Sequence, residues 1–193
     1  MDIIGFTGKI ESGKSTAAHY IGLYSNRWNA KGRYQIRSFA TIFKQIMQDY
    51  FHFSQDDLYT PEGKKTIHPL WGITPREFMQ KFGEGMKPLF GEDFWVKLTD
   101  CWIDDLGKGH DIVHTLIFDD VRRDIEAELI KRRGGKIIRV VRPGWDASFT
   151  GIKDHISESG ISQKYIDYTV VNTTDDKEKF RQAIHTAYDT LFK

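Results

Sequence analysis

The chain has 193 residues, and its 28 lysines and arginines nearly balance its 27 aspartates and glutamates. Because there is no broad positive field, we expect binding neither to nucleic acid polymers nor to anionic membranes. The only cysteine, Cys101, excludes an internal disulfide and a multi-cysteine metal cage, and it fits a reducing cytoplasm. No apolar run approaches the ~20 residues of a membrane span. These features predict a soluble cytoplasmic protein.

The first informative segment joins an apolar run at residues 3–6 to a glycine-rich turn. Residues 8–15 fit the pattern G-x-x-x-x-G-K-[ST], and the apolar residues after them recur at helical spacing. A strand that delivers such a turn to a helix N-terminus points backbone N–H groups and the helix dipole at phosphate oxygens. The alternative is a chance Gly-Lys-Ser in an ordinary turn. The order of strand, turn and helix favours a nucleoside triphosphate site.

Each residue type in this loop has a chemical reason to be there. Gly8 and Gly13 permit the turn and close backbone approach, Lys14 reaches the β- and γ-phosphates, and the Ser15 hydroxyl ligates Mg²⁺. Glu11 either contacts a sugar or a basic residue or is exposed to solvent. The predicted ATP-binding residues of the loop are Gly8, Lys9, Ile10, Glu11, Ser12, Gly13, Lys14, Ser15 and Thr16.

Apolar runs of strand length alternate with helical patterns along the chain, which predicts an α/β protein with a parallel sheet covered on both faces. The expected strands are residues 2–7, 34–39, 112–118, 136–141 and 168–172. The expected helices are residues 14–25, 40–52, 75–82, 93–106, 121–133 and 176–191. In the helix at 93–106, the spacing predicts that Cys101 packs in an apolar stripe with Trp95, Leu98 and Trp102.

Two stretches interrupt this alternation within what we interpret as one domain, residues 1–193. Residues 53–92 contain no convincing strand but many prolines and glycines, and they predict an inserted cap. Residues 143–165 are polar, begin with Pro-Gly, and predict a lid.

Charged residues follow the expected strands at the sheet edge where open α/β sheets bind ligands. Asp119, Asp120 and Arg122 follow the third expected strand, and Arg142 follows the fourth. We assign Arg142 to the donor phosphates and Arg122 to a phosphate at the reaction centre, since guanidinium binds phosphate oxygens in pairs. One aspartate serves the metal and the other orients an arginine. The alternative for both is a cap of the helix expected at 121–133.

The order of these motifs, together with several others, resembles the bacteriophage-type deoxynucleoside monophosphate kinases, a branch of the P-loop nucleoside monophosphate kinases. The similarity runs through most of the chain. The segments that carry it are residues 8–16, Phe39-Ala40 with Lys44, 74–83, 91–96, 120–128, 134–143, 154–158 and 170–172. The chain differs from the family pattern after the cap helix, where Lys87 stands in place of an arginine, and at residues 123–126.

The resemblance implies a three-layer P-loop fold and transfer of the ATP γ-phosphoryl group to a deoxynucleoside 5′-monophosphate, with Mg²⁺ as cofactor. Catalysis is then assigned to Lys14, Asp120 and Arg122, and the metal to Ser15 and Asp119. The implied acceptor-binding residues are Lys44, Arg76, Gln80, Lys87, Trp95, Arg122, His155 and Glu158. The location becomes the host cytoplasm if the chain is viral.

The acceptor assignments have structural alternatives. Arg76 and Gln80 share one face of the helix expected at 75–82, which suits contacts with a phosphate and a base edge but equally suits an exposed face. Trp95 either stacks on a base or packs in a core. The rival functions are a P-loop kinase for another small acceptor, such as dephospho-coenzyme A, and a nucleotide-binding regulatory module without turnover. Homodimer formation is left open.

Overall fold

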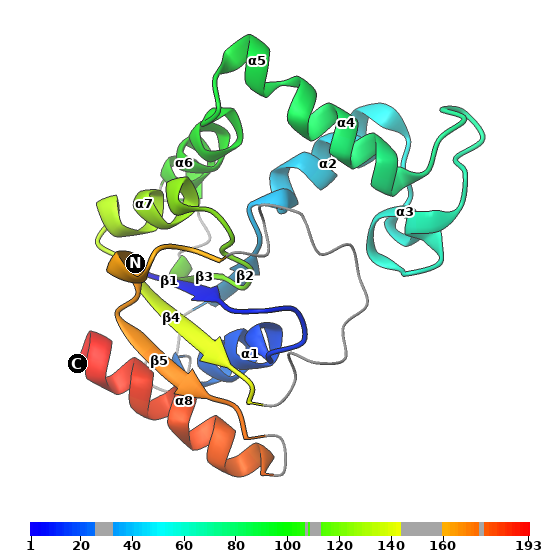
Figure 1. Ribbon diagram of the computed structural model, residues 1–193. Helices are drawn as coiled ribbons and strands as arrows, with labels where there is room; N and C mark the ends of the chain where they lie inside the picture. Colours follow the sequence, from blue (N-terminus) through cyan, green and yellow to red (C-terminus); the bar gives the residue numbers. More distant parts are fainter. Residues whose placement is uncertain (26–32, 107, 109–112, 144–159, 174–175) are drawn as a thin grey trace. The chain divides into compact units, whose positions relative to one another are not determined.

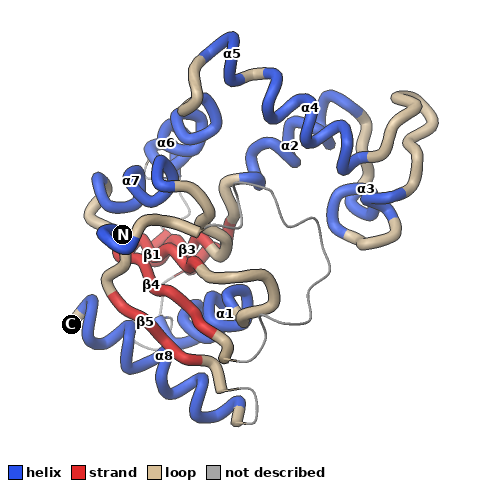
Figure 2. The backbone as a smooth tube through the Cα atoms, in the orientation of Figure 1, coloured by secondary structure: helices blue, strands red, loops and turns tan. Residues whose placement is uncertain are grey.

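The computed structural model describes residues 1–25, 33–106, 108, 113–143, 160–173 and 176–193. Within these residues the chain divides into two compact units, residues 1–38 with 103–193 and residues 39–102. We describe each unit by itself. Figures 1 and 2 show the helices and strands of both.

The first unit contains a five-stranded parallel sheet in the order β2-β3-β1-β4-β5. The strands are β1 (Asp2–Thr7), β2 (Arg33–Arg37), β3 (Val113–Phe118), β4 (Lys136–Val141) and β5 (Tyr168–Val171). Strand β1 pairs with β3 and β4, with Ile4 opposite Ile117 and Phe6 opposite Ile138. The continuous apolar run at its residues 3–6 is typical of a strand buried on both faces. The predicted α/β class and five-stranded parallel sheet are confirmed.

Helices cover both faces of this sheet (Figure 1). Helices α1 (Lys14–Ser25) and α8 (Lys177–Phe192) pack on one face, where Ile4, Phe6 and Ile184 belong to a single buried cluster. Helix α7 (Asp124–Arg132) covers the other face. A Cβ atom at Gly5 would lie 2.7 Å from the Ile130 side chain, so glycine at this position lets α7 pack close against β1.

The second unit contains α2 (Ala40–Phe51), α3 (Gln55–Tyr59), η1 (Gly63–Lys65), α4 (Pro75–Gly85), α5 (Lys87–Phe90) and most of α6 (Phe94–Leu106). Phe43, Met47, Phe53 and Leu58 are buried at its centre. Phe51, Phe78, Phe82 and Trp95 pack against them. The unit includes residues 53–92, the cap expected from the sequence, and extends beyond them in both directions because α2 and α6 contribute to the same aromatic core.

Several predicted elements need correction. Helix α7 begins at Asp124 rather than at 121, because the Val121 N–H donates to the Phe6 carbonyl and keeps the preceding residues on the sheet edge. Helix α3 was missed because it is only five residues long, although Ser54 and Asp57 form a capping box at its start. Helix α5 and the 3-10 turns η1 and η4 (Gln163–Tyr165) were missed for the same reason of length.

Cys101 was predicted to be packed, and it is exposed. The buried face of α6 is instead formed by Val96, Thr99 and Ile103. These three residues recur at i, i+3 and i+7, the spacing of one helix face. The sequence pattern selected the neighbouring face because it favoured the larger tryptophan and leucine side chains.

Among the described residues, no helix combines the length and apolar character that crossing a membrane requires.

Candidate active site

The glycine-rich turn connects β1 to the N-terminus of α1 in the first unit, as predicted. Gly8 and Gly13 have φ angles of 145° and 104°, which favour glycine. Glu11 has a φ of 59°, which non-glycine residues rarely adopt. Space is also limiting, since a Cβ at Gly8 would lie 2.3 Å from the Val140 carbonyl oxygen. The fold therefore requires both the backbone freedom and the small size of glycine here.

Side chains around the turn donate hydrogen bonds to several of its carbonyl groups. Lys14 Nζ donates to the carbonyls of Gly8 (2.8 Å) and Lys9 (2.9 Å). The Glu11 carbonyl accepts a 3.1 Å bond from Arg142 Nη1, and the Ser12 carbonyl accepts a 2.9 Å bond from Asn172 Nδ2. The first N–H groups of α1 have no acceptor within the helix, as at every helix N-terminus. This arrangement favours binding of an anion at the start of α1.

The second part of the site is the segment that follows β3. The Asp119 N–H donates to the Arg37 carbonyl, and the Val121 N–H donates to the Phe6 carbonyl. Asp119 Oδ2 accepts a 3.2 Å hydrogen bond from the Ser15 hydroxyl. Asp120 lies 3.7 Å from Lys14 Nζ and accepts a 2.6 Å bond from Arg122 Nε. The two aspartates therefore contact different parts of the site.

Burial shifts the pKa of two groups in opposite directions from their usual values. It lowers the pKa of Lys14, an effect that the nearby Asp120 carboxylate opposes. It raises the pKa of Asp119, an effect that the hydrogen bond from Ser15 opposes. Each charge is thus less stable here than in water, and a ligand of opposite charge would stabilise it.

Neither aspartate caps α7, so the helix-cap alternative for this pair is wrong. The residue that performs this task is Glu126, whose side chain accepts hydrogen bonds from the N–H groups of Arg122 (2.8 Å) and Arg123 (3.1 Å). Burial raises the pKa of Glu126, and these backbone bonds oppose that shift. Sequence reasoning missed this role of Glu126 because the start of the helix was placed three residues too early.

A cavity of about 500 Å³ lies beside the turn. Its lining includes five predicted residues of the turn and Arg142, and also side chains that the sequence analysis did not select. The unselected lining residues are Tyr20, Asn172, Thr173, Lys177 and Phe180. They come from α1 and from the junction of β5 with α8, which is far away in the sequence. Of these five residues, the sequence could have indicated only Asn172, because it is a polar residue that directly follows a strand.

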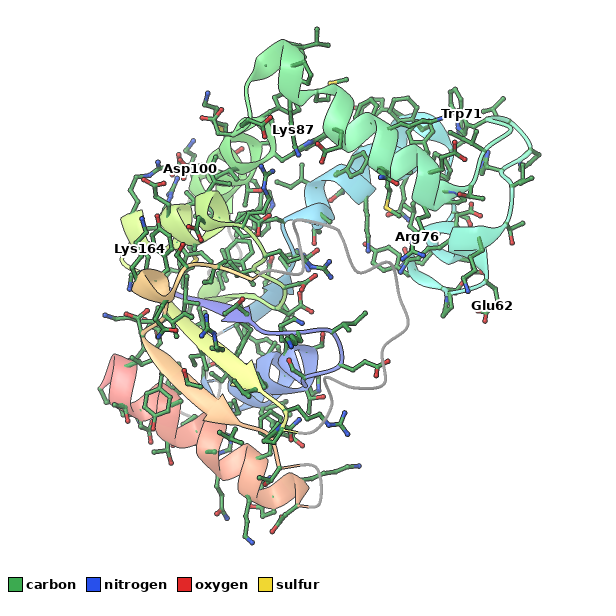
Figure 3. The ribbon with its side chains drawn as sticks, viewed as in Figure 1. Glu62, Trp71, Arg76, Lys87, Asp100 and Lys164 are labelled. Atoms are coloured by element: carbon green, nitrogen blue, oxygen red, sulfur yellow. The ribbon has the colours of Figure 1, made fainter. Side chains whose placement is uncertain are left out.

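The second unit contains five predicted acceptor residues. Arg76 and Gln80 are exposed on α4, and Arg76 points toward the side where α3 lies (Figure 3). Lys44 Nζ lies 4.1 Å from the centre of the Tyr59 ring, and Lys87 forms a 2.5 Å ion pair with Glu84. Trp95 donates its indole N–H to the Gly83 carbonyl at 2.8 Å. Its ring packs against Phe43, which favours the core role that the sequence left open.

The predicted acceptor residues His155 and Glu158 lie outside the described residues, as does most of the predicted lid at 143–165. Thr74 caps α4 and Pro75 occupies its first turn. Among the described residues, no group of three or more histidine, cysteine, aspartate or glutamate side chains is arranged to hold a metal ion by itself.

Comparison with known proteins identifies the family. The sequence model of the deoxynucleotide monophosphate kinases matches residues 65–184. A protein of Acanthamoeba polyphaga mimivirus, named "Putative deoxynucleotide monophosphate kinase", is 30% identical over 195 residues, covering 95% of both chains. This chain belongs to the deoxynucleotide monophosphate kinase family. The resemblance found in the sequence is thus confirmed at the level of the family.

Membership makes the chain a phosphotransferase that acts on nucleotides. Among solved structures, the shikimate kinase of Bacteroides thetaiotaomicron aligns over 98% of both chains, with a TM-score of 0.46 and 11% identity. A likeness this distant carries no argument about the substrate of a deoxynucleotide monophosphate kinase.

Proposed function

We propose that this kinase transfers the γ-phosphoryl group of ATP to a deoxynucleoside 5′-monophosphate, giving the diphosphate and ADP. The observation that carries the proposal is the arrangement around Lys14. Several carbonyls of the turn that precedes Lys14 are engaged by side chains, and the Asp120–Arg122 pair lies next to the Lys14 ammonium group. Phosphoryl transfer mainly requires alignment and neutralisation of charge, and these are the groups that supply both.

In the donor site, the N–H groups at the start of α1 and the Lys14 ammonium bind the β- and γ-phosphates. Lys14 is already held by two carbonyls of the turn, so little side-chain freedom is lost on binding. Its positive charge, which burial destabilises, becomes more favourable when phosphate oxygens approach. Arg142 supports the same loop and adds a positive charge beside it.

The residues present fit a magnesium ion that arrives with the nucleotide. Ser15 and Asp119 offer a hydroxyl and a carboxylate oxygen 3.2 Å apart, and hard cations such as Mg²⁺ prefer oxygen ligands and few protein groups. Bound Mg²⁺ would neutralise charge on the β- and γ-phosphate oxygens. Asp119 is the better candidate than Asp120 because Asp120 is engaged by Lys14 and Arg122.

Arg122 has the geometry of a residue prepared for a phosphate. Asp120 binds its Nε, so the terminal nitrogens Nη1 and Nη2 remain to contact phosphate oxygens. Glu126 holds the Arg122 backbone N–H at 2.8 Å and thereby fixes the position from which the side chain extends. We assign Arg122 to the transferring group and the acceptor phosphate.

For the acceptor nucleotide we assign Arg76 to the phosphate and Gln80 to the base edge. The two side chains are four residues apart on α4 and are both exposed. Lys44 and Lys87 add positive charge to the same unit, although each already has an internal partner.

The function is tested by measuring ADP release with ATP and a panel of ribo- and deoxynucleoside monophosphates, with dephospho-coenzyme A included. We expect turnover with at least one deoxynucleoside monophosphate and none with dephospho-coenzyme A. Turnover only with dephospho-coenzyme A would contradict the acceptor. Binding of ATP without turnover on any acceptor would favour the regulatory alternative.

A further inference from the structure

Asn172 is a polar residue of the donor site whose task neither the loop pattern nor the family assigns. It follows the last residue of β5, and its backbone N–H donates a 2.7 Å hydrogen bond to the Val141 carbonyl at the end of β4. Its position is therefore set by two neighbouring strands of the sheet. A side chain supported in this way is held more precisely than one on a loop.

The Asn172 side chain makes two contacts with the phosphate loop. Its Nδ2 donates to the Ser12 carbonyl at 2.9 Å. The same nitrogen would lie 2.6 Å from a Cβ atom at Gly13, so the amide packs directly against the Gly13 backbone. Gly13 is thus required for a second reason besides its φ of 104°, since any larger residue would displace Asn172.

The hydrogen bond determines which way one peptide group faces. In a trans peptide the C=O and N–H groups point in opposite directions. Because the Ser12 carbonyl faces Asn172, the N–H of Gly13 is turned away from it. Arg142 holds the preceding carbonyl, that of Glu11, in the same manner from the end of β4.

We propose that Asn172 is a positioning residue that keeps the phosphate loop in its binding conformation before the nucleotide arrives. The proposal rests on the proposed function, since it assigns a role within the same donor site. Without the tether the Ser12–Gly13 peptide is free to rotate, and its carbonyl oxygen then faces the phosphate oxygens. The peptide must rotate back before a ligand binds, and this cost lowers the affinity for every ligand that contains the phosphates.

Asn172 also lines the cavity, so a role in contacting the nucleoside is the rival explanation. The two are separated by probes that contain only half of the donor. Inorganic tripolyphosphate with Mg²⁺ reports on the loop, and adenosine reports on the nucleoside. Affinities for both probes and for ATP are measured calorimetrically, with KM for the acceptor and the unfolding temperature measured alongside.

For Asn172→Ala we expect tripolyphosphate and ATP to bind more weakly by a similar factor of about 10, the size expected for one hydrogen bond. Adenosine affinity and the acceptor KM stay unchanged. Asn172→Leu keeps the volume without the donor and shows the same loss. Asn172→Gln keeps the amide on a longer stem and recovers part of the affinity. Gln182→Ala removes an amide from α8 outside the cavity, where it bonds Glu178, and serves as the matched control.

The proposal is overturned if adenosine loses affinity while tripolyphosphate does not, because Asn172 then contacts the nucleoside. It is also overturned if Asn172→Leu binds tripolyphosphate like the wild type, because volume alone is then sufficient. Equal loss of both probes together with a fall in unfolding temperature shows a general structural role and overturns it as well. If the wild-type protein binds neither ATP nor tripolyphosphate, the proposed donor site itself fails.

Discussion

The phosphate loop in the first unit and the proposed acceptor residues in the second differ in how they are built. The loop is contiguous in sequence, and donors just after β4, just after β5 and at the start of α1 engage several of its carbonyls. The proposed acceptor residues of the second unit are spread over α2, α4, α5 and α6. Three of them have partners within their own unit, namely Tyr59 for Lys44, Glu84 for Lys87 and the Gly83 carbonyl for Trp95.

This difference predicts which of the two regions should tolerate amino-acid substitutions. A loop whose carbonyls are held by several side chains should lose function with many substitutions, because each residue supports the next. The proposed acceptor side chains lie on separate helices, and each is either exposed or held by a different partner, so one residue can change while the others remain. The predictions below test this contrast, from the largest effect to the smallest.

Removing the central cation of the loop should have the largest effect. For Lys14→Ala we expect turnover to fall by about 10²-fold or more, as for loss of a preorganised group at a developing charge. The folded protein should not be destabilised, since burial lowers the Lys14 pKa and its charge is unfavourable without ligand. Steady-state rates and thermal unfolding measure both effects. Lys97→Ala, which removes an exposed lysine from α6, is the control. Near-normal turnover by Lys14→Ala would refute the loop assignment.

Substitution of Arg122 should affect the acceptor substrate and leave the binding of ATP nearly unchanged. We expect Arg122→Ala to reduce kcat/KM for the acceptor by about 10²-fold, while the affinity for ATP changes little, because its free nitrogens serve the acceptor side of the reaction. Initial rates over both substrates and an ATP titration measure the two quantities. Arg132→Ala removes an exposed cation from α7, the helix that begins after Arg122, and should leave both quantities unchanged. A collapse of ATP affinity with an unchanged acceptor KM would move Arg122 to the donor site.

Substitution of Arg76 tests the proposed acceptor residues of the second unit. Arg76→Ala should raise the acceptor KM by about 10-fold with little change in the ATP KM, because one exposed cation is lost while the partly buried Lys44 and Lys87 remain. Lys81→Ala lies on the same helix, where its lysine pairs with Glu77, and provides the matched control. An unchanged acceptor KM in Arg76→Ala, at all acceptors tested, would leave α4 without the phosphate contact assigned to it.

The smallest effect concerns the stability of the loop region without ligand. Because the pKa of Asp119 is raised above 3.8, the folded protein holds this proton more strongly than the unfolded chain does. This contribution to stability is present below pH 3.8 and is lost as the pH rises through the folded-state pKa. At pH 7, Asp119→Asn should therefore unfold at an equal temperature or at one about 2 °C higher. A clear fall in unfolding temperature would show that ionised Asp119 supports the ligand-free fold.

Much of the first unit was predictable from the sequence. Strands β1 and β4 and helix α1 have the predicted bounds, because buried apolar runs and helical spacing are local signals. The start of α7 was not predictable, since it depends on a hydrogen bond between Val121 and Phe6, which belong to different strand ends. The exposure of Cys101 depended on which face of α6 finds a partner, and periodicity within one helix does not decide that.

In the candidate site, too, the local features were predictable from the sequence and the long-range contacts were not. Lys14, Ser15 and the two glycines are recognisable because the chemistry of phosphate binding needs them within eight consecutive residues. The pairing of Ser15 with Asp119 joins residues 104 positions apart, and that of Asn172 with Ser12 joins residues 160 positions apart. No local pattern reports such pairs, and in a parallel sheet they depend on which strands become neighbours.

The sequence by itself determined the class of fold, the phosphate loop and its resemblance to the family, since each is expressed in short runs of residues. Only the tertiary structure decided that Asp119 meets Ser15, that Asp120 meets Arg122, and that Glu126 rather than an aspartate caps α7. It also decided that Asn172 reaches the loop. The physical reason is the strand order β2-β3-β1-β4-β5, which brings the ends of β3, β4 and β5 to the same edge of the sheet as the loop after β1.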